Sequence, residues 1–244
     1  DGLEIERGTD PLVVDERGGG QVTIEILGTG VEALLGGDLT DPENDGLDEA
    51  GAAMDPSWNW VNITGNIEDD FGDPEAAFNI FDNQVGGGGA KWCCDDPSPD
   101  NPYWVSVEFA EAVSLTHFTI TNGNDSPDRD PTNWQIQGSN DGETFETIFA
   151  EDAESIWTEE RNEVALVTLA SPSAPYKHIR YIVFDTPGAL HQLNEIEYFG
   201  NVATSLLVNG SFEEPVLDNI NTNNLGTVPT GWSQTGDDAT WNLI

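Results

Sequence analysis

Positive charge is scarce in this chain. Lys and Arg together number 7 in 244 residues, against 46 Asp and Glu, so the formal net charge is −39. Nucleic acids and anionic membrane surfaces are bound by basic patches, and the composition therefore argues against both as partners. Two compatible explanations of the acidity remain: a solvated surface that keeps a secreted protein soluble, and ligation of calcium by carboxylate oxygens.

Long apolar runs are also missing. No stretch approaches the ~18 apolar residues that a membrane-spanning helix needs, which argues against membrane insertion. The chain has no signal-peptide pattern and opens with Asp1 rather than Met, as expected for a mature or excised fragment. Aromatic residues are plentiful, with 8 Trp and 10 Phe, so the chain can build a core despite its charge. We expect a folded, extracellular protein, either secreted or held at the cell surface.

Only two cysteines are present, and they are adjacent, at Cys93 and Cys94. Neighbouring Cα atoms lie ~3.8 Å apart, below the usual disulfide range of ~4.4–6.8 Å. A vicinal disulfide, two free thiols near a metal loop, and a bridge to another chain are the three alternatives.

The residue pattern divides the chain into three parts. Residues 1–57 form an acidic N-terminal arm or the end of a preceding β domain. In this part the alternating run 21–27 pairs in a hairpin with 12–14 across a glycine turn. Residues 58–200 form the main domain. Residues 201–244 are expected to be a linker and the start of a second jelly-roll-like domain, with a linker lacking structure as the alternative.

The main domain reads as a series of short strands. Residues 103–109 and 115–121 alternate apolar and polar side chains, and Ser139-Asn-Asp-Gly142 is a strong turn signal. This spacing of strands, without a long helical period, predicts an all-β fold, an antiparallel β-sandwich of the jelly-roll type. The further strands are expected at 134–138, 145–149, 164–169, 178–184 and 195–199.

Two stretches at opposite ends of this domain carry a family resemblance. They are Ala77–Trp92, AFNIFDNQVGGGGAKW, and Leu193–Gly200, LNEIEYFG. Between them, residues 121–134 place an Arg-Asp-Pro loop before a Trp strand, followed by the turn at 138–142. Together these motifs resemble the coagulation-factor type C (discoidin) domain and family 32 carbohydrate-binding modules of bacterial secreted or surface proteins. The resemblance implies a galactose-binding-domain-like sandwich that binds carbohydrate or other surfaces.

The resemblance also implies a calcium (Ca²⁺) site. In such domains an Asp that follows an apolar residue and a Glu that opens the last strand supply carboxylates, and nearby backbone carbonyls complete the shell. Carried over to this sequence, the carboxylates are Asp82 and Glu195. The carbonyls are those of Asn79, Gln84 and Asn194.

One position departs from the family pattern. Ala90 stands where these domains often have Ser or Thr, and Gly86–Gly89 lengthen the loop. One ligand must then come from a glycine carbonyl or from water, or the site lacks it. The alternative is that Asp82 only caps a turn and Glu195 faces solvent.

A second candidate metal loop lies in the N-terminal part. Asp41, Glu43, Asp45 and Asp48 have the spacing of calcium loops, with a glycine where the chain must turn sharply. Ala52 stands at the twelfth position, where an EF-hand has its bidentate Glu, so the loop is not a complete EF-hand. An acidic turn without metal is the alternative.

Sugar sites need an aromatic platform and a few planar polar groups. Trp157 lies in a polar segment, and His191 lies in a loop before the last strand, so both are candidates together with Arg129. Ordinary packing is the alternative for Trp157 and His191. Arg129 has the alternative of bracing its own loop through Asp125 or Asp130.

No motif singles out a catalytic acid, nucleophile, phosphate loop or zinc site, so we expect no enzymatic activity. The expected function is that of a calcium-stabilised, lectin-like adhesive module that binds glycans or cell-surface polysaccharide. A structural subunit of a surface filament or layer, self-associating through edge strands, is the alternative. A third hypothesis is a calcium-dependent adhesin that contacts proteins.

Overall fold

The computed structural model describes residues 12–15, 22–40, 60–65, 75–94, 96–152, 155–158, 160–203, 232–235 and 240–243. The candidate metal loop from Asp41 to Asp48 lies outside these residues. The only helices described are four short 3-10 turns, none of which is long and apolar enough to cross a membrane. They are η1 (Val31–Ala33), η2 (Ala77–Phe81), η3 (Gly88–Ala90) and η4 (Pro127–Arg129).

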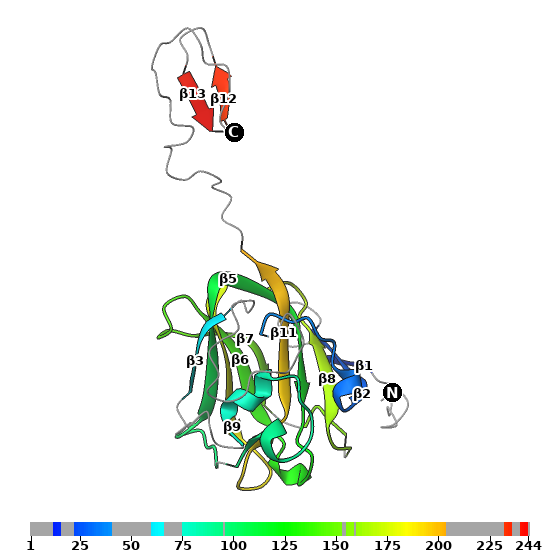
Figure 1. Ribbon diagram of the computed structural model, residues 1–244. Coiled ribbons are helices and arrows are strands. Elements are labelled where there is room, and N and C mark those ends of the chain that lie inside the picture. Colours follow the sequence, from blue (N-terminus) through cyan, green and yellow to red (C-terminus); the bar gives the residue numbers. More distant parts are fainter. Residues whose placement is uncertain are drawn as a thin grey trace, which may run out of the picture. The chain divides into compact units, whose positions relative to one another are not determined.

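The described part of the main domain is an antiparallel β-sandwich, as predicted (Figure 1). Its strands are β1 (Leu12–Asp15), β2 (Val22–Thr29), β3 (Trp60–Gly65), β4 (Trp92–Cys93), β5 (Tyr103–Thr121), β6 (Asn133–Ser139), β7 (Glu146–Glu151), β8 (Glu163–Thr168), β9 (Tyr176–Asp185), β10 (Gln192–Leu193) and β11 (Glu195–Val202). One layer has the order β3-β5-β9-β6-β7, and the other has the order β1-β2-β8-β5-β11.

Strand β5 belongs to both layers. Its first part pairs with β3 through Phe109 and with β9 through Glu108. Its last part pairs with β11 from Val113 and with β8 from His117. The register with β9 shifts between Glu108 and Val113, where the strand bends, and Figure 1 shows this bend at the top of the sandwich. The two strands predicted at 103–109 and 115–121 are therefore one continuous 19-residue strand.

The core lies between the layers and is built by the inward-facing residues of each alternating strand. Trp134 of β6 is fully buried at its centre. Its ring centroid lies 5.1 Å from that of Phe149, 5.9 Å from that of Tyr181 and 6.2 Å from that of Phe118. These rings come from β6, β7, β9 and β5, so they join both layers.

The N-terminal segment is part of the sandwich. The predicted hairpin forms between β1 and β2, and β2 also pairs with β8 from Thr23 to Thr29. Ile24 of β2 reaches the core, with 5% of its surface exposed. The segment expected to be an arm or the end of a preceding β domain thus supplies a strand to the main sheet.

The chain divides into two compact units, Asp1–Ala203 and Thr204–Ile244. In the second unit, β12 (Trp232–Thr235) and β13 (Thr240–Leu243) form an antiparallel hairpin.

A buried glutamate holds residues 34–40 against β11. Glu197 lies on the face of β11 that points away from the core and is fully buried. Its carboxylate accepts hydrogen bonds from the backbone N–H groups of Leu35 and Gly36 and, at 2.6 Å, from the hydroxyl of Thr119. The N–H of Leu39 then donates to the carbonyl of Tyr198. One carboxylate therefore ties the N-terminal segment to the last strand.

Replacing Glu197 with Gln should destabilise the domain. An amide offers one acceptor oxygen where the carboxylate offers two, so at least one of these three donors loses its partner. We expect the free energy of unfolding in urea to fall by about 1–3 kcal/mol. Glu143→Gln, at an exposed site, should change it by less than about 0.5 kcal/mol. Equal effects of the two substitutions would contradict the role given to Glu197.

Candidate functional site at the loop end

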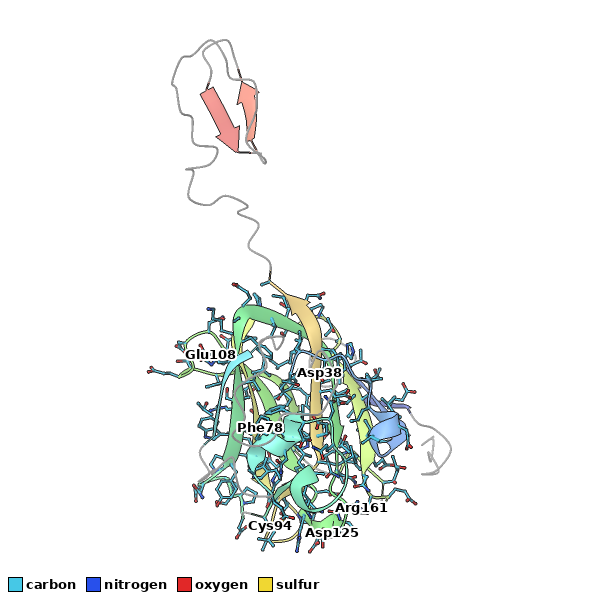
Figure 2. The ribbon with its side chains drawn as sticks, in the orientation of Figure 1. Asp38, Phe78, Cys94, Glu108, Asp125 and Arg161 are labelled. Carbon is cyan, nitrogen blue, oxygen red and sulfur yellow. A yellow bond between two sulfur atoms is a disulfide. The ribbon has the colours of Figure 1, made fainter. Side chains whose placement is uncertain are left out.

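Four loops meet at one end of the sandwich. The amide of Gly86 donates to Asn194 Oδ1 at 3.3 Å, Asn162 donates to the carbonyl of Gly123 at 3.2 Å, and Gly188 donates to the carbonyl of Asp128 at 2.6 Å. Figure 2 labels Cys94, Asp125 and Arg161 at this end, opposite the bend of β5. Loops at the end of a sandwich are the usual place for binding residues, because the rigid sheets position them.

The structure brings Asp82 and Glu195 together. Asp82 ends η2 and Glu195 begins β11, and only 4% and 1% of their respective surfaces are exposed. The N–H of Asn83 donates to Glu195 Oε2 at 2.8 Å, and the N–H of Gln84 donates to Asp82 Oδ1 at 3.0 Å. Glu195 therefore does not face solvent, although Asp82 does accept a turn hydrogen bond.

The side chains of the other predicted ligands support the frame of this site. Asn79 donates its amide N–H to the carbonyl of Lys91 at 2.9 Å, which fixes η2 to the glycine-rich loop. Asn194 donates to the carbonyl of Asn122 at 2.7 Å and to Asn162 Oδ1 at 2.9 Å. The amide of Gln84 reaches Asp82 Oδ2 at 3.3 Å. Asp82 and Gln84 are thus bonded to each other, whereas the side chains of Asn79 and Asn194 hold the neighbouring loops.

Burial and neighbouring negative charges raise the pKa of Glu195 well above its usual value. Burial is the largest cause, followed by the charges of Asp82, Asp38 and Glu197. Sequence reasoning missed Asp38 and Glu197. Glu197 lies two residues after Glu195 on the same face of a strand, so the strand period could have revealed it. Asp38 is 3% exposed and comes from the N-terminal segment, which no local pattern connects to β11.

The donor atoms here fit a hard cation. Carboxylate oxygens predominate, and calcium prefers carboxylate, carbonyl and hydroxyl oxygens. Thr121 adds a fully buried hydroxyl that has no hydrogen-bond partner among the described residues. Because Thr121 lies directly opposite Glu195 across the β5–β11 pair, the two side chains are on the same face of the sheet. This hydroxyl is the kind of donor that Ala90 does not supply.

Arg129 lies beside a second group of charges. Its guanidinium Nη1 is 3.7 Å from Asp125 Oδ1, which is the brace expected from the sequence. The same carboxylate oxygen is 3.6 Å from Lys91 Nζ. Asp130, the other expected brace, instead pairs with Arg161 at 2.8 Å. Arg129 and Asp125 remain partly open to solvent, with 28% and 51% of their side-chain surfaces exposed.

The two cysteines form the vicinal disulfide in this structure, and they lie next to Arg129. The guanidinium Nη1 of Arg129 is 3.9 Å from Cys93 Sγ and 3.8 Å from Cys94 Sγ. Both cysteines are partly exposed. The disulfide and the guanidinium thus share one partly open surface at the loop end.

The expectation that Trp157 and His191 offer rings to a ligand is wrong, because both side chains are buried. Trp157 is 5% exposed and donates its indole N–H to the carbonyl of Ile120 at 3.2 Å. His191 is 1% exposed, and its Nε2 lies 3.1 Å from the hydroxyl of Tyr181. Its ring packs edge-on against Trp92, with 4.7 Å between centroids. Both residues stabilise the loops from inside.

The buried imidazole of His191 should make stability depend on pH. Burial lowers its pKa to about 3, whereas an exposed imidazole has a pKa of about 6.5. The unfolded chain therefore binds a proton below about pH 6.5 that the folded chain excludes, and stability is lost as the pH falls from 6.5 toward 3. This loss reaches at most about 1.4 kcal/mol per pH unit.

The test compares urea unfolding of the wild type and His191→Phe between pH 7 and 4. The variant keeps a ring against Trp92 and loses the titrating group, so its stability should fall less steeply with decreasing pH. His178→Phe, at a half-buried site on β9, is a second replacement of a histidine by phenylalanine and is measured beside it. If the stability of His191→Phe falls with pH as steeply as that of the wild type, the imidazole of His191 is not the cause of the pH dependence.

The middle of the chain matches a known family model. The match to the F5/8 type C domain spans residues 62–196, more than half of the 244 residues. The chain belongs to the F5/8 type C domain family. The predicted discoidin resemblance is thereby confirmed, and both carboxylates of the carried-over site lie within the match. A search of curated proteins finds no match.

Similar solved structures include two bacterial modules and a fish lectin. The CpGH89CBM32-5 module of Clostridium perfringens, solved with GalNAc-β-1,3-galactose, is 14% identical, with a TM-score of 0.44 over 57% of this chain and 94% of that chain. The family 32 module of NanJ from the same organism, solved with galactose, is 19% identical. Its TM-score is 0.43, and the match covers 56% of this chain and 91% of that chain. A fucolectin from striped bass is 17% identical. Its TM-score is 0.45, and the match covers 58% of this chain and 47% of that chain. These values are too low to indicate a ligand for this chain.

Proposed function

We propose that this F5/8 type C domain is a calcium-stabilised carbohydrate-binding module of a secreted or surface protein, with no catalytic activity of its own. The observation that carries the proposal is the arrangement of the loop end. Buried oxygen donors around Asp82 and Glu195 form its base, and the partly exposed pair Arg129 and Asp125 lies at its surface.

The surface groups suit a hydroxyl-rich ligand. A guanidinium donates several hydrogen bonds in one plane and a carboxylate accepts them, so together they recognise neighbouring sugar hydroxyls. Lys91, Arg129 and Asp125 also bring opposite charges close together. The net charge of −39 would repel a polyanion, so we expect an uncharged or weakly charged glycan.

Calcium would be held by the carboxylates of Asp82 and Glu195, the backbone carbonyls of Asn79, Gln84 and Asn194, and the hydroxyl of Thr121. The ion would place a positive charge beside Glu195, whose ionised form is disfavoured by burial and by the neighbouring negative charges. It would also connect the η2 loop to β11, because its ligands come from both. Its role would be structural, since one proposed ligand, Thr121, ends β5 just before the loop that carries Arg129.

The calcium proposal predicts a conditional loss of stability. Asp82→Asn and Glu195→Gln should each lower the melting temperature much more in calcium than in chelator, because they remove ligands. A bound ion contributes about 2.7 kcal/mol at a concentration 100 times its Kd, so this difference is measurable by calorimetry.

Glu163→Gln is the matched control for the calcium test. Glu163 is also a buried carboxylate, 4% exposed, and it accepts hydrogen bonds from the N–H and the hydroxyl of Thr158. Glu163→Gln should lower the melting temperature by the same amount in calcium and in chelator. If Asp82→Asn and Glu195→Gln behave like this control, the calcium site is refuted.

The glycan proposal is tested with a glycan array, followed by titration of the best ligand. Arg129→Met should weaken binding by about tenfold or more and leave the melting temperature nearly unchanged, because it removes hydrogen bonds at a partly exposed site. Arg180→Met is the matched control on the face of the β5–β9–β6 sheet, where Arg180 lies over Phe145. A blank array with folded protein contradicts glycan binding and turns attention to self-assembly.

A further inference from the structure

Three side chains with metal-binding atoms converge at the edge of the loop end. A carboxylate oxygen of Glu75 and the Sγ atoms of Cys93 and Cys94 all lie within 4.8 Å of one another. Cys94 Sγ is 3.8 Å from Glu75 Oε2. This group does not include Asp82 or Glu195, and its sulfur atoms are of a chemical type that calcium does not bind.

The backbone fixes the position of this group. The N–H of Cys93 donates to the carbonyl of Glu75 at 3.0 Å, so the two residues are linked directly. Cys93 also lies in β4, where it pairs with Gln192 of β10. Main-chain hydrogen bonds therefore hold Glu75 and Cys93 close together, and these bonds do not depend on the disulfide.

The sulfur atoms are joined in this structure, so they become ligands only after reduction. A dithiol reductant donates two electrons and two protons and becomes a cyclic disulfide, while the Cys93–Cys94 bond breaks and yields two thiols. A divalent cation then displaces both thiol protons. Both cysteines are partly exposed, which gives a reductant and a metal access to them.

The surrounding charges favour a divalent cation in the reduced form. Lys91 Nζ lies 3.9 Å from Glu75 Oε1 and 3.6 Å from Asp125 Oδ1, and Arg129 lies 3.7 Å from the same atom of Asp125. The net charge of these two carboxylates and two cationic side chains is zero. Two thiolates would add two negative charges, and one divalent cation restores the balance. The guanidinium of Arg129, within 4 Å of both sulfurs, favours thiolate over thiol.

We propose that reduction converts the Cys93–Cys94 disulfide into a binding site for a thiophilic divalent cation of the zinc and cadmium type. The two thiolates and the Glu75 carboxylate are three ligands, and water is the fourth. Tetrahedral zinc with bonds of about 2.3 Å to sulfur and about 2.1 Å to oxygen has its ligand atoms about 3.6 Å apart. The 3.8 Å between Cys94 Sγ and Glu75 Oε2 is close to that separation.

The experiment uses the full chain and cadmium alone as the probe, with calcium at saturating concentration to occupy oxygen sites. The chain is reduced with excess dithiol, freed of reductant without oxygen, and titrated with Cd²⁺. We expect a thiolate-to-metal charge-transfer band that saturates at one Cd²⁺ per chain, with both thiols protected from a thiol reagent. The oxidised chain should show no band.

Variants identify the ligands. Cys93→Ser and Cys94→Ser should each abolish saturable binding at this stoichiometry. Glu75→Gln should weaken it by about tenfold or more. Glu111→Gln, at an exposed site on β5, is the matched control and should bind as the wild type does.

Three results would overturn the proposal: no saturable band in the reduced chain, the same band in the oxidised chain, or wild-type affinity in Glu75→Gln. Circular dichroism accompanies the titration. If reduction alone unfolds the domain, the group cannot assemble and the proposal fails as well. The cadmium titration does not depend on glycan binding, so failure of this proposal can be distinguished from failure of the proposed function.

Discussion

The burial of two glutamates on one face of β11 is the constraint on which the sandwich depends. Glu195 and Glu197 lie two residues apart and are 1% and 0% exposed. A buried carboxylate is unfavourable unless donors or cations compensate it. Three donors surround Glu197, and two of them are backbone N–H groups of the N-terminal segment. Glu195 accepts a hydrogen bond from the N–H of Asn83, and the negative charges of Asp82 and Asp38 lie near it. Two segments distant in sequence therefore come to β11 because of these carboxylates.

The distribution of positive charge complements this arrangement. Lys91, Arg129 and Arg161 are three of the seven cationic side chains in the protein, and all three contact Asp125 or Asp130. An acidic chain can fold its loops closely only where the like charges are compensated. Of the five cationic residues in the described part of the chain, three therefore lie at the loop end, where they form paired charges.

Local patterns predicted the strands well because alternation is a property of each strand alone. Most expected strands lie within two residues of the observed ones. The family resemblance named Asp82 and Glu195 together, and the hydrogen bond from Asn83 to Glu195 places them in one region of the fold. Trp157 and His191 were misassigned for a physical reason. The polar residues around Trp157 suggest exposure, but its indole N–H reaches across to β5, and this long-range contact has no local signature. Asp38 was missed because its segment reaches β11 only through tertiary hydrogen bonds.

The bend in β5 has a consequence for cooperativity. This one strand pairs with β3, β8, β9 and β11, so each layer of the sandwich includes part of it. Neither layer can separate without breaking main-chain hydrogen bonds of a strand that the other layer holds. The two sheets therefore open together, and the amide protons in the paired parts of β5, at 105–108 and 118–121, should exchange with solvent only through global unfolding of the domain.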